Sequence, residues 1–214
     1  MKKSLFILVF SILFAGTSLA QVRFGITTGL NFSSFSGDKN FNGDSWGYLV
    51  GFQGGLVVDI GITENFSIIP ELLYSQRGAY NKYEEIENKK NTVEFSFILN
   101  YLQVPVNLAY KLNVGSSKLS LFAGPYVGYA LSGQFKTDYN MDGEKESEKE
   151  DIEFGSDVEQ MKALDYGVNI GAGFEFGSGM FLKLQYNMGL NNLSNDNSAN
   201  VKNTNVAFTV GYLF

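Results

Sequence analysis

The chain of 214 residues contains no cysteine and no histidine. The absence of cysteine excludes a disulfide framework, a thiolate metal site and a cysteine nucleophile. The absence of histidine excludes Ser-His-Asp catalysis and the HExxH zinc motif. The net charge of −6 leaves no basic stripe that could contact phosphates, so we expect no binding to nucleic acid. Most familiar enzyme classes are therefore excluded, and no cofactor is expected.

Proline is also scarce, with 3 residues, whereas glycine and aromatic residues are abundant. The chain has 24 Gly, 19 Phe, 12 Tyr and 1 Trp. Aromatic residues favour strands, and glycine allows backbones to approach closely. The composition indicates an all-β protein.

The first twenty residues have the features of a signal peptide. Lys2 and Lys3 precede an apolar run over 5–14, which is shorter than the roughly 20 residues that a membrane-spanning helix needs. Small residues then precede a predicted cleavage site between Ala20 and Gln21. We expect a signal peptide over 1–20 and a single mature domain over 21–214. A retained N-terminal anchor is the alternative.

The mature chain alternates apolar and polar residues with a period of two, which is typical of strands. In the C-terminal segment, for example, Phe208, Val210 and Tyr212 share one face. The sequence contains eight such segments of about ten residues or more, the length that a tilted membrane strand requires. In the segment 93–112 the apolar residues change parity near Tyr101, which predicts a β-bulge there.

The connections between these segments alternate strictly between long and short. The long ones span 33–46, 78–92, 132–163 and 191–202, and the short ones span 61–65, 113–118 and 177–179. An up-and-down barrel with short turns on the inner side of the membrane, long loops outside and both termini inside predicts this order. A soluble β-sandwich with Greek-key connections gives no reason for it.

The two faces of the strands differ in chemistry. One is dominated by Gly, Asn, Ser and Thr, and the other by Phe, Tyr, Leu and Val. Small polar residues suit the narrow interior of an eight-stranded barrel, and large aromatic residues suit a face toward lipid. With the signal peptide and the alternating loops, this favours an eight-stranded antiparallel up-and-down transmembrane β-barrel in the outer membrane of a Gram-negative bacterium. A secreted soluble barrel, apolar inside, is the alternative.

Several short stretches resemble the PorT-type outer-membrane β-barrel family, and the resemblance extends over essentially the whole mature chain. These stretches are Tyr101-Leu102-Gln103-Val104-Pro105-Val106, Gly124-Pro125-Tyr126-Val127-Gly128-Tyr129, Asp165-Tyr166-Gly167-Val168-Asn169-Ile170-Gly171-Ala172-Gly173 and 184–193. The resemblance implies an eight-stranded outer-membrane barrel surrounded by outer-membrane lipid. The chain also ends like the signal that the barrel-insertion machinery reads, with Phe208, Val210, Tyr212 and Phe214 on one face.

Nine charged residues have the parity of the small polar face. They are Arg23, Asp59, Glu71, Arg77, Glu94, Lys111, Asp165, Glu175 and Lys183. Because a buried charge needs a partner, we predict an ion-pair network that fills the lumen. The alternatives are a selective pore or a carboxylate pair for acid-base chemistry. Barrel lipases, deacylases and proteases of the outer membrane resemble one another in needing a catalytic histidine, so we expect no enzyme.

The connection 132–163 is strongly acidic. Within it, Asp138, Asn140, Asp142 and Gly143 match the first half of the calcium-loop pattern, but the twelfth position is Lys149 instead of glutamate. We expect a solvated, mobile acidic loop, with weak calcium binding as the alternative.

Four aromatic residues lie near the predicted outer ends of the strands. Trp46, Tyr48, Tyr80 and Tyr83 are interpreted as anchors at the membrane interface.

These observations predict a non-enzymatic membrane protein whose long outer loops bind an unknown extracellular or envelope partner. A small-solute pore or carrier, and a secreted soluble binding protein, are the alternative functions.

Overall fold

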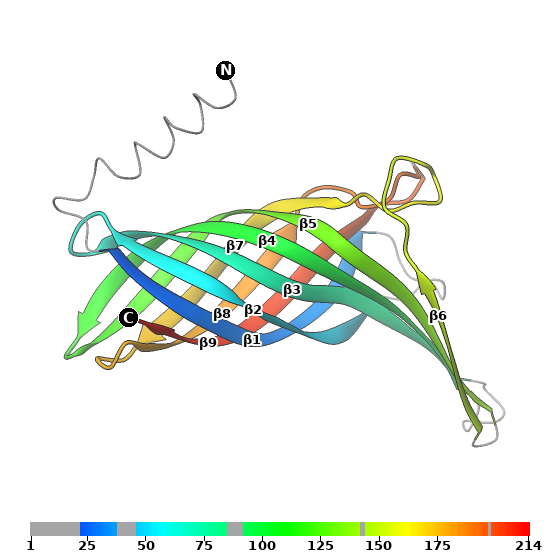
Figure 1. The fold of residues 1–214 in the computed structure, drawn as a ribbon, viewed down its shortest axis with the longest axis horizontal. Helices are drawn as coiled ribbons and strands as arrows, with labels where there is room; N and C mark the ends of the chain where they lie inside the picture. Colours follow the sequence, from blue (N-terminus) through cyan, green and yellow to red (C-terminus); the bar gives the residue numbers. More distant parts are fainter. Residues whose placement is uncertain (1–21, 38–45, 85–91, 142–143, 197) are drawn as a thin grey trace.

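The computed structural model describes residues 22–37, 46–84, 92–141, 144–196 and 198–214 (Figure 1). In this part of the chain the regular elements are nine strands. They are β1 (Val22–Gly37), β2 (Gly47–Gly61), β3 (Phe66–Glu84), β4 (Thr92–Val114), β5 (Ser117–Met141), β6 (Glu144–Asp151), β7 (Leu164–Glu175), β8 (Met180–Gly189) and β9 (Val201–Leu213). The described residues include no helix long and apolar enough to cross a membrane.

Eight of the strands form a closed antiparallel ring. The sheet order is β4-β3-β2-β1-β9-β8-β7-β5, and pairing of β4 with β5 closes it. The β6 strand pairs only with β5 among the described residues, so it lies outside the ring. The predicted eight-stranded up-and-down barrel is confirmed, with one further strand in the fifth connection.

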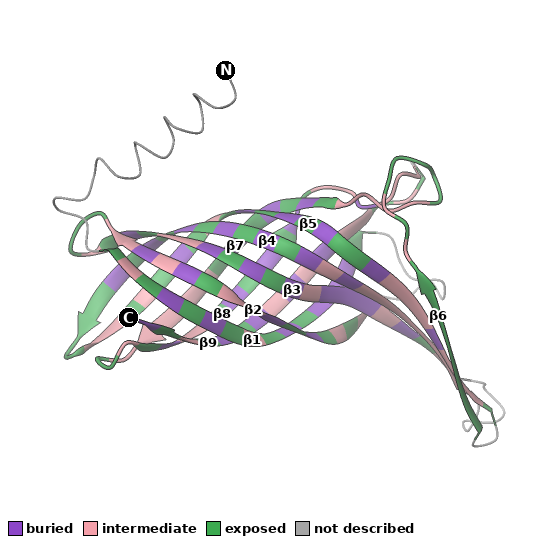
Figure 2. Ribbon diagram, viewed as in Figure 1, coloured by how far each residue is buried: buried purple, intermediate pink, exposed green. Residues whose placement is uncertain are grey.

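Buried and exposed residues alternate along the strands (Figure 2), and the exposed ones include most of the large apolar residues, whereas the buried ones are mainly polar or small. On β1, Phe24 and Ile26 are 63% and 53% exposed, whereas Thr27 and Asn31 are buried. The same alternation runs along most of β4, from Leu99 to Lys111. Because a soluble barrel would bury its apolar face, this arrangement is the one expected of a barrel surrounded by lipid.

The two ends of the barrel differ. At one end, the turn end, the connections are 62–65, 115–116 and 176–179, and strand β1 begins there while β9 ends there (Figure 1). At the other, the loop end, the longer connections gather. The predicted alternation of short and long connections is therefore present, with the start of β1 and the end of β9 on the side of the short turns.

The predicted bulge is in the right place but in the wrong strand. The register of β4 with β5 shifts where Asn100 pairs with Ser132 and Tyr101 pairs with Ala130. The extra residue is therefore Leu131 of β5, and the side chains of β4 continue to alternate past Tyr101. The apolar residues of β4 change parity because those before Tyr101 face inward and those after it face lipid.

The inward-facing apolar residues close the barrel at the loop end. Leu99 lies in a buried cluster, the mouth cluster, against which Trp46 and Phe97 pack. Ring centroids of Trp46 lie 5.5 Å from Phe35 and 5.6 Å from Phe97. The buried members of the mouth cluster are Phe35, Ala79, Leu99, Tyr101, Ala130 and Leu193.

The interpretation of four aromatic residues as interface anchors is therefore wrong for Trp46, which packs inside the mouth. Tyr80 is only half-buried, so the structure does not contradict its interpretation as an anchor. Tyr48 is exposed on the outer face, as an anchor would be. Sequence parity does not separate these positions, because both faces of the strands carry aromatic residues at this height.

Four strands continue beyond the mouth as a sheet that we call the extension (Figure 1). It comprises 79–84 of β3, 92–98 of β4, 134–141 of β5 and the whole of β6. The predicted connections 78–92 and 132–163 are too long, because strand pairing continues into both. The expected mobile acidic loop is thus wrong for 134–141 and 144–151, which pair as a β-hairpin.

Candidate functional site

The charged residues of the lumen form separate groups along the barrel. Nearest the turn end, Asp59 Oδ2 accepts hydrogen bonds from Arg23 Nη2 and Lys111 Nζ, both at 2.5 Å. Arg23 also donates to both carboxylate oxygens of Glu175, at 2.5 and 2.9 Å. This group joins β1, β2, β4 and β7 across the lumen, and its side chains are mostly buried.

A second ion pair links opposite walls of the barrel. Lys183 Nζ on β8 donates to the two carboxylate oxygens of Glu71 on β3, at 2.5 and 2.7 Å. The ammonium also lies 5.7 Å from the ring centroid of Phe122. A cation held by a carboxylate and an aromatic face in this way is stable away from bulk water.

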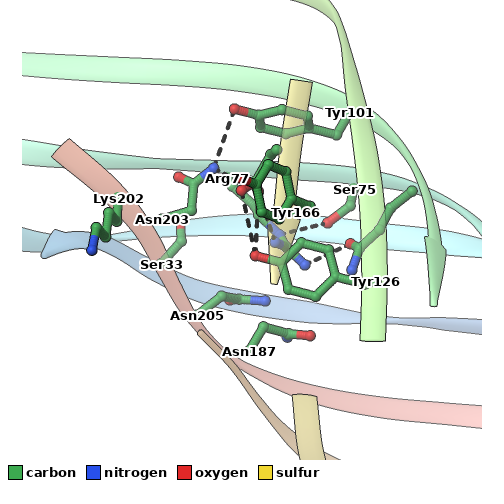
Figure 3. A network of polar contacts seen from close by, with 12 residues as sticks. Ser33, Ser75, Arg77, Tyr101, Tyr126, Tyr166, Asn187, Lys202, Asn203 and Asn205 are labelled. Atoms are coloured by element: carbon green, nitrogen blue, oxygen red, sulfur yellow. Dashed lines mark hydrogen bonds and ion pairs between the residues drawn. The ribbon is translucent and has the colours of Figure 1, made fainter. Parts of the chain in front are cut away.

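The third group is buried in the part of the lumen beneath the mouth cluster (Figure 3). Arg77 Nη1 lies 3.6 Å from Asp165 Oδ2, and both side chains are 1% exposed. Arg77 also donates to Gln103 Oε1 at 2.5 Å, and its guanidinium lies 5.2 Å from the Tyr126 ring centroid. Asp165 on β7 in turn accepts from Asn203 Nδ2 on β9 at 3.0 Å, so side chains from other strands satisfy both ions.

The three groups are electrically balanced. Four cations face four carboxylates, namely Arg23, Arg77, Lys111 and Lys183 with Asp59, Glu71, Asp165 and Glu175. Because the charges cancel, the lumen needs no counterion from solvent. Each buried charge has a partner from another strand, so the network also ties the walls of the barrel together.

Glu94, the ninth residue of the predicted network, does not belong to it. It lies in the extension, where it is directly opposite Lys82 on β3. Its carboxylate is 3.7 Å from Lys82 Nζ, and the side chain is 43% exposed. Its even parity places it on the outer face of β4, because this strand does not change phase at Tyr101.

The side chains leave little space in the middle of the lumen, whereas a larger cavity of about 360 Å³ lies at its turn end, lined by Arg23, Asp59 and Lys111 among others. The cavity next to Lys111 and Lys183 has a volume of about 50 Å³, enough for a few water molecules only. Apolar side chains such as Val57 and Phe181 form part of its wall. At the loop end, the mouth cluster covers the buried Arg77–Asp165 pair. An eight-stranded ring has room for side chains and little else, and these side chains occupy it.

The inner face of the extension carries a row of aromatic and apolar side chains. Among them only Tyr83 has a predicted role, as an interface anchor, and the structure places it in this row instead. The ring of Phe135 lies 5.8 Å from Phe95, nearly parallel to it, and 4.8 Å from Phe97. Tyr83 meets Phe95 edge to face at 5.6 Å. We call this row the aromatic strip: Tyr83, Val93, Phe95, Phe97, Phe135 and Tyr139.

Glutamates of β6 lie beside the aromatic strip. Glu146 is directly opposite Tyr139, and Glu150 is directly opposite Phe135. Residues directly opposite in an antiparallel pair share a face, so Glu146, Glu148 and Glu150 border the strip. The sequence signal was a glutamate at every second position of 144–150, which is the period of a strand.

The weak calcium candidate is split by the hairpin. Asp138 and Asn140 lie in extended β5, not in the curled loop that wraps a calcium ion, and Asp142 lies outside the described residues. Lys136 Nζ donates to Asp138 Oδ2 at 2.6 Å, and this hydrogen bond lowers the pKa of Asp138. In the described ranges, no group of three or more Asp or Glu side chains is placed to hold a metal ion.

The predicted targeting residues fall at the two chain ends. Ala20 and Gln21 lie outside the described residues. At the C-terminus, Phe208, Val210, Tyr212 and Phe214 are exposed on the outer face of the barrel, and the last two rings touch edge to face at 5.4 Å.

A closed ring of long strands with an apolar outer belt defines a β-barrel of the membrane-spanning class. The sequence model of the family described as outer membrane protein beta-barrel domain matches residues 14–195. The chain therefore belongs to this family, and it is an outer-membrane protein. No curated protein matches the chain significantly.

Solved structures of outer-membrane barrels are also similar. Ail, the attachment invasion locus protein of Yersinia pestis, is 15% identical in its complex with the heparin analogue sucrose octasulfate. The similarity covers 91% of this chain and 99% of Ail, with a TM-score of 0.40. Neisserial surface protein A is 12% identical over 89% of this chain and 97% of its own, with a TM-score of 0.44. At this level of similarity, no binding property is transferred from these proteins.

Proposed function

We propose that the protein is a non-enzymatic outer-membrane barrel that binds a partner at its loop end, on the outside of the cell. The observation that carries this proposal is the contrast between the two parts of the molecule. The lumen is closed by paired charges and by the mouth cluster. The extension instead presents an ordered, solvent-facing surface, and long outer structures on a rigid barrel are where such proteins carry function.

A small-solute pore or carrier is less well supported. A carrier needs a route for its solute through the lumen. Between the larger cavity at the turn end and the mouth cluster, the cavity among the ion pairs has a volume of only about 50 Å³. The lumen charges are also paired with each other, which leaves them unavailable to a passing ion.

The proposal includes the events that bring the chain to the membrane. We infer that a signal peptide over 1–20 is removed before Gln21. We also infer that the exposed aromatic residues of β9, ending in Phe214, are read by the barrel-insertion machinery, and that lipid then surrounds the apolar belt. The four stretches quoted above support a relationship to the PorT-type outer-membrane β-barrel family.

The orientation of the barrel tests the proposal, because the binding surface must face outward. The chain has no cysteine, so a single introduced thiol reports on one position. Ser147 is exposed on β6 in the extension, and Ser116 is exposed in the turn between β4 and β5. A membrane-impermeant maleimide should label the Ser147→Cys variant on intact cells. The Ser116→Cys variant should be labelled only after lysis.

The reverse labelling pattern would place the extension on the periplasmic side and would exclude binding at the cell surface. Heat-modifiable gel migration of both variants provides the control that each barrel has folded.

A further inference from the structure

Two hollows meet on the inner face of the extension. One has a volume of about 560 Å³ and is lined by members of the aromatic strip, including Phe95 and Tyr139. The second, also of about 560 Å³, continues from Phe135 and Phe97 to Ile152 and Met161. Phe135 borders both hollows, and we call them together the outer groove: its first half is apolar, and its second half combines apolar with acidic side chains.

Carboxylates surround the second half of the outer groove. Five acidic residues line it together with the apolar floor: Glu150, Asp151, Glu153, Asp157 and Glu159. All five are exposed, and none of them forms an ion pair within the described part of the chain. Lys149 adjoins Glu150 in sequence but lies on the other face of β6, directly opposite Lys136. Two further lysines near these carboxylates are engaged elsewhere. Lys136 pairs with Asp138, and Lys162 Nζ donates to the backbone oxygens of Asn192 and Ser194.

The segment that carries these carboxylates is held in place. Asn195 Nδ2 donates to the backbone oxygens of Gly155, Asp157 and Gln160, at 2.9 to 3.1 Å. Backbone hydrogen bonds also join Met161 to Glu153 and Ile152 to Gly133. The five carboxylates, which we call the acidic wall, are therefore fixed relative to the aromatic strip before any ligand arrives. This reduces the entropy cost of binding.

We propose that the outer groove binds an extended cationic peptide segment that also carries apolar side chains. Its apolar side chains occupy the hollows over Phe97 and Phe135, and its lysines or arginines meet Glu148, Glu150 and the acidic wall. Aromatic floors and carboxylate borders both favour such cations. The proposal rests on the function proposed above, since the groove must face the outside.

Charge complementarity favours a cationic peptide over two other occupants of the outer groove. A second copy of the chain would bring its own acidic wall against the first, because the whole protein has a net charge of −6. An anionic lipid surface would be repelled in the same way. An apolar ligand without charge would leave the carboxylates unused, whereas a cationic peptide with apolar residues satisfies both halves of the groove.

Binding of labelled peptides to the folded full-length protein in phosphatidylcholine nanodiscs tests the proposal. The probe is a nonapeptide that alternates lysine with leucine, and fluorescence anisotropy gives its Kd. One control peptide replaces lysine by glutamate, and a second replaces leucine by serine. Only the lysine–leucine peptide should bind tightly, because the glutamate–leucine peptide has no cations and the lysine–serine peptide has no apolar side chains.

A pair of double variants locates the site. The E148Q/E150Q protein loses two carboxylates on the groove side and should bind about tenfold more weakly. The E94Q/D138N protein loses the same charge on the opposite face of the same sheet, so its Kd should stay within about twofold.

Equal weakening in both double variants, equal affinity for the lysine–serine peptide, or self-association of the protein in place of peptide binding would each overturn the proposal. A lack of peptide binding, combined with outside labelling of the Ser147→Cys variant, would refute the cationic partner and leave surface binding intact. Labelling from the inside would refute both.

Discussion

The Asp165→Asn variant should unfold with a free energy about 3–5 kcal/mol lower than that of the unmodified protein. Asparagine has nearly the same shape as aspartate, so the change removes the charge and little else. Arg77 would then remain 1% exposed without its counter-charge. Urea unfolding in lipid vesicles, followed by the fluorescence of Trp46, the only tryptophan, measures the loss.

A matched variant shows whether the loss of stability depends on the burial of the ion pair or only on the loss of a charge. Glu94→Gln removes a carboxylate from the pair with Lys82, where both side chains are about two-fifths exposed. Exposed pairs contribute at most about 1 kcal/mol, so this variant should be close to the unmodified protein. The double variant Arg77→Met/Asp165→Leu should recover part of the loss, because no buried charge is left unpaired. Similar small losses for Asp165→Asn and Glu94→Gln would contradict the assigned lumen network.

The Leu99→Ala variant should lose about 2–5 kcal/mol of unfolding free energy. Leu99 is fully buried in the mouth cluster, where the surrounding side chains cannot collapse into the space that it leaves. Trp46 packs against the same cluster, so its emission should shift to longer wavelength as water approaches. The unfolding measurement described for Asp165→Asn gives both quantities.

Leu102→Ala is the control for this prediction. Leu102 lies three positions along the same strand but faces outward, toward lipid. Lipid chains can fill the space, so only the transfer of the side chain from water is lost and the effect should be smaller. Equal losses at the two positions, or a larger loss at Leu102, would mean that the inward-facing apolar residues before Tyr101 do not close the barrel.

The barrel itself could be predicted because its signals are local. Period-two alternation, strand length and the order of long and short connections each depend on neighbouring residues only. The set of lumen charges followed from parity for the same reason, and it failed only at Glu94. Glu94 lies beyond the mouth of the barrel. The change of apolar parity near Tyr101 suggested that β4 exchanges its inward and outward faces there, but the side chains of β4 keep their alternation.

What depends on pairing between distant strands could not be predicted. Arg77 meets Asp165 because the register around the ring brings β3 and β7 to the same height, and no local pattern encodes that register. The extension was missed because acidic composition outweighed alternation. Glutamates at every second residue of 144–150 indicate a strand, but their charge suggested a solvated loop.

The central claim is that the lumen is closed and that the protein acts through its loop end. Single-channel recording of the folded full-length protein in planar bilayers tests this most directly, with heat-modifiable gel migration of the same sample as proof of folding. Because the ion pairs and the mouth cluster fill the ring, the bilayer should remain silent at all voltages that it withstands. Reproducible conductance steps from the folded protein would contradict the closed lumen and would favour a pore.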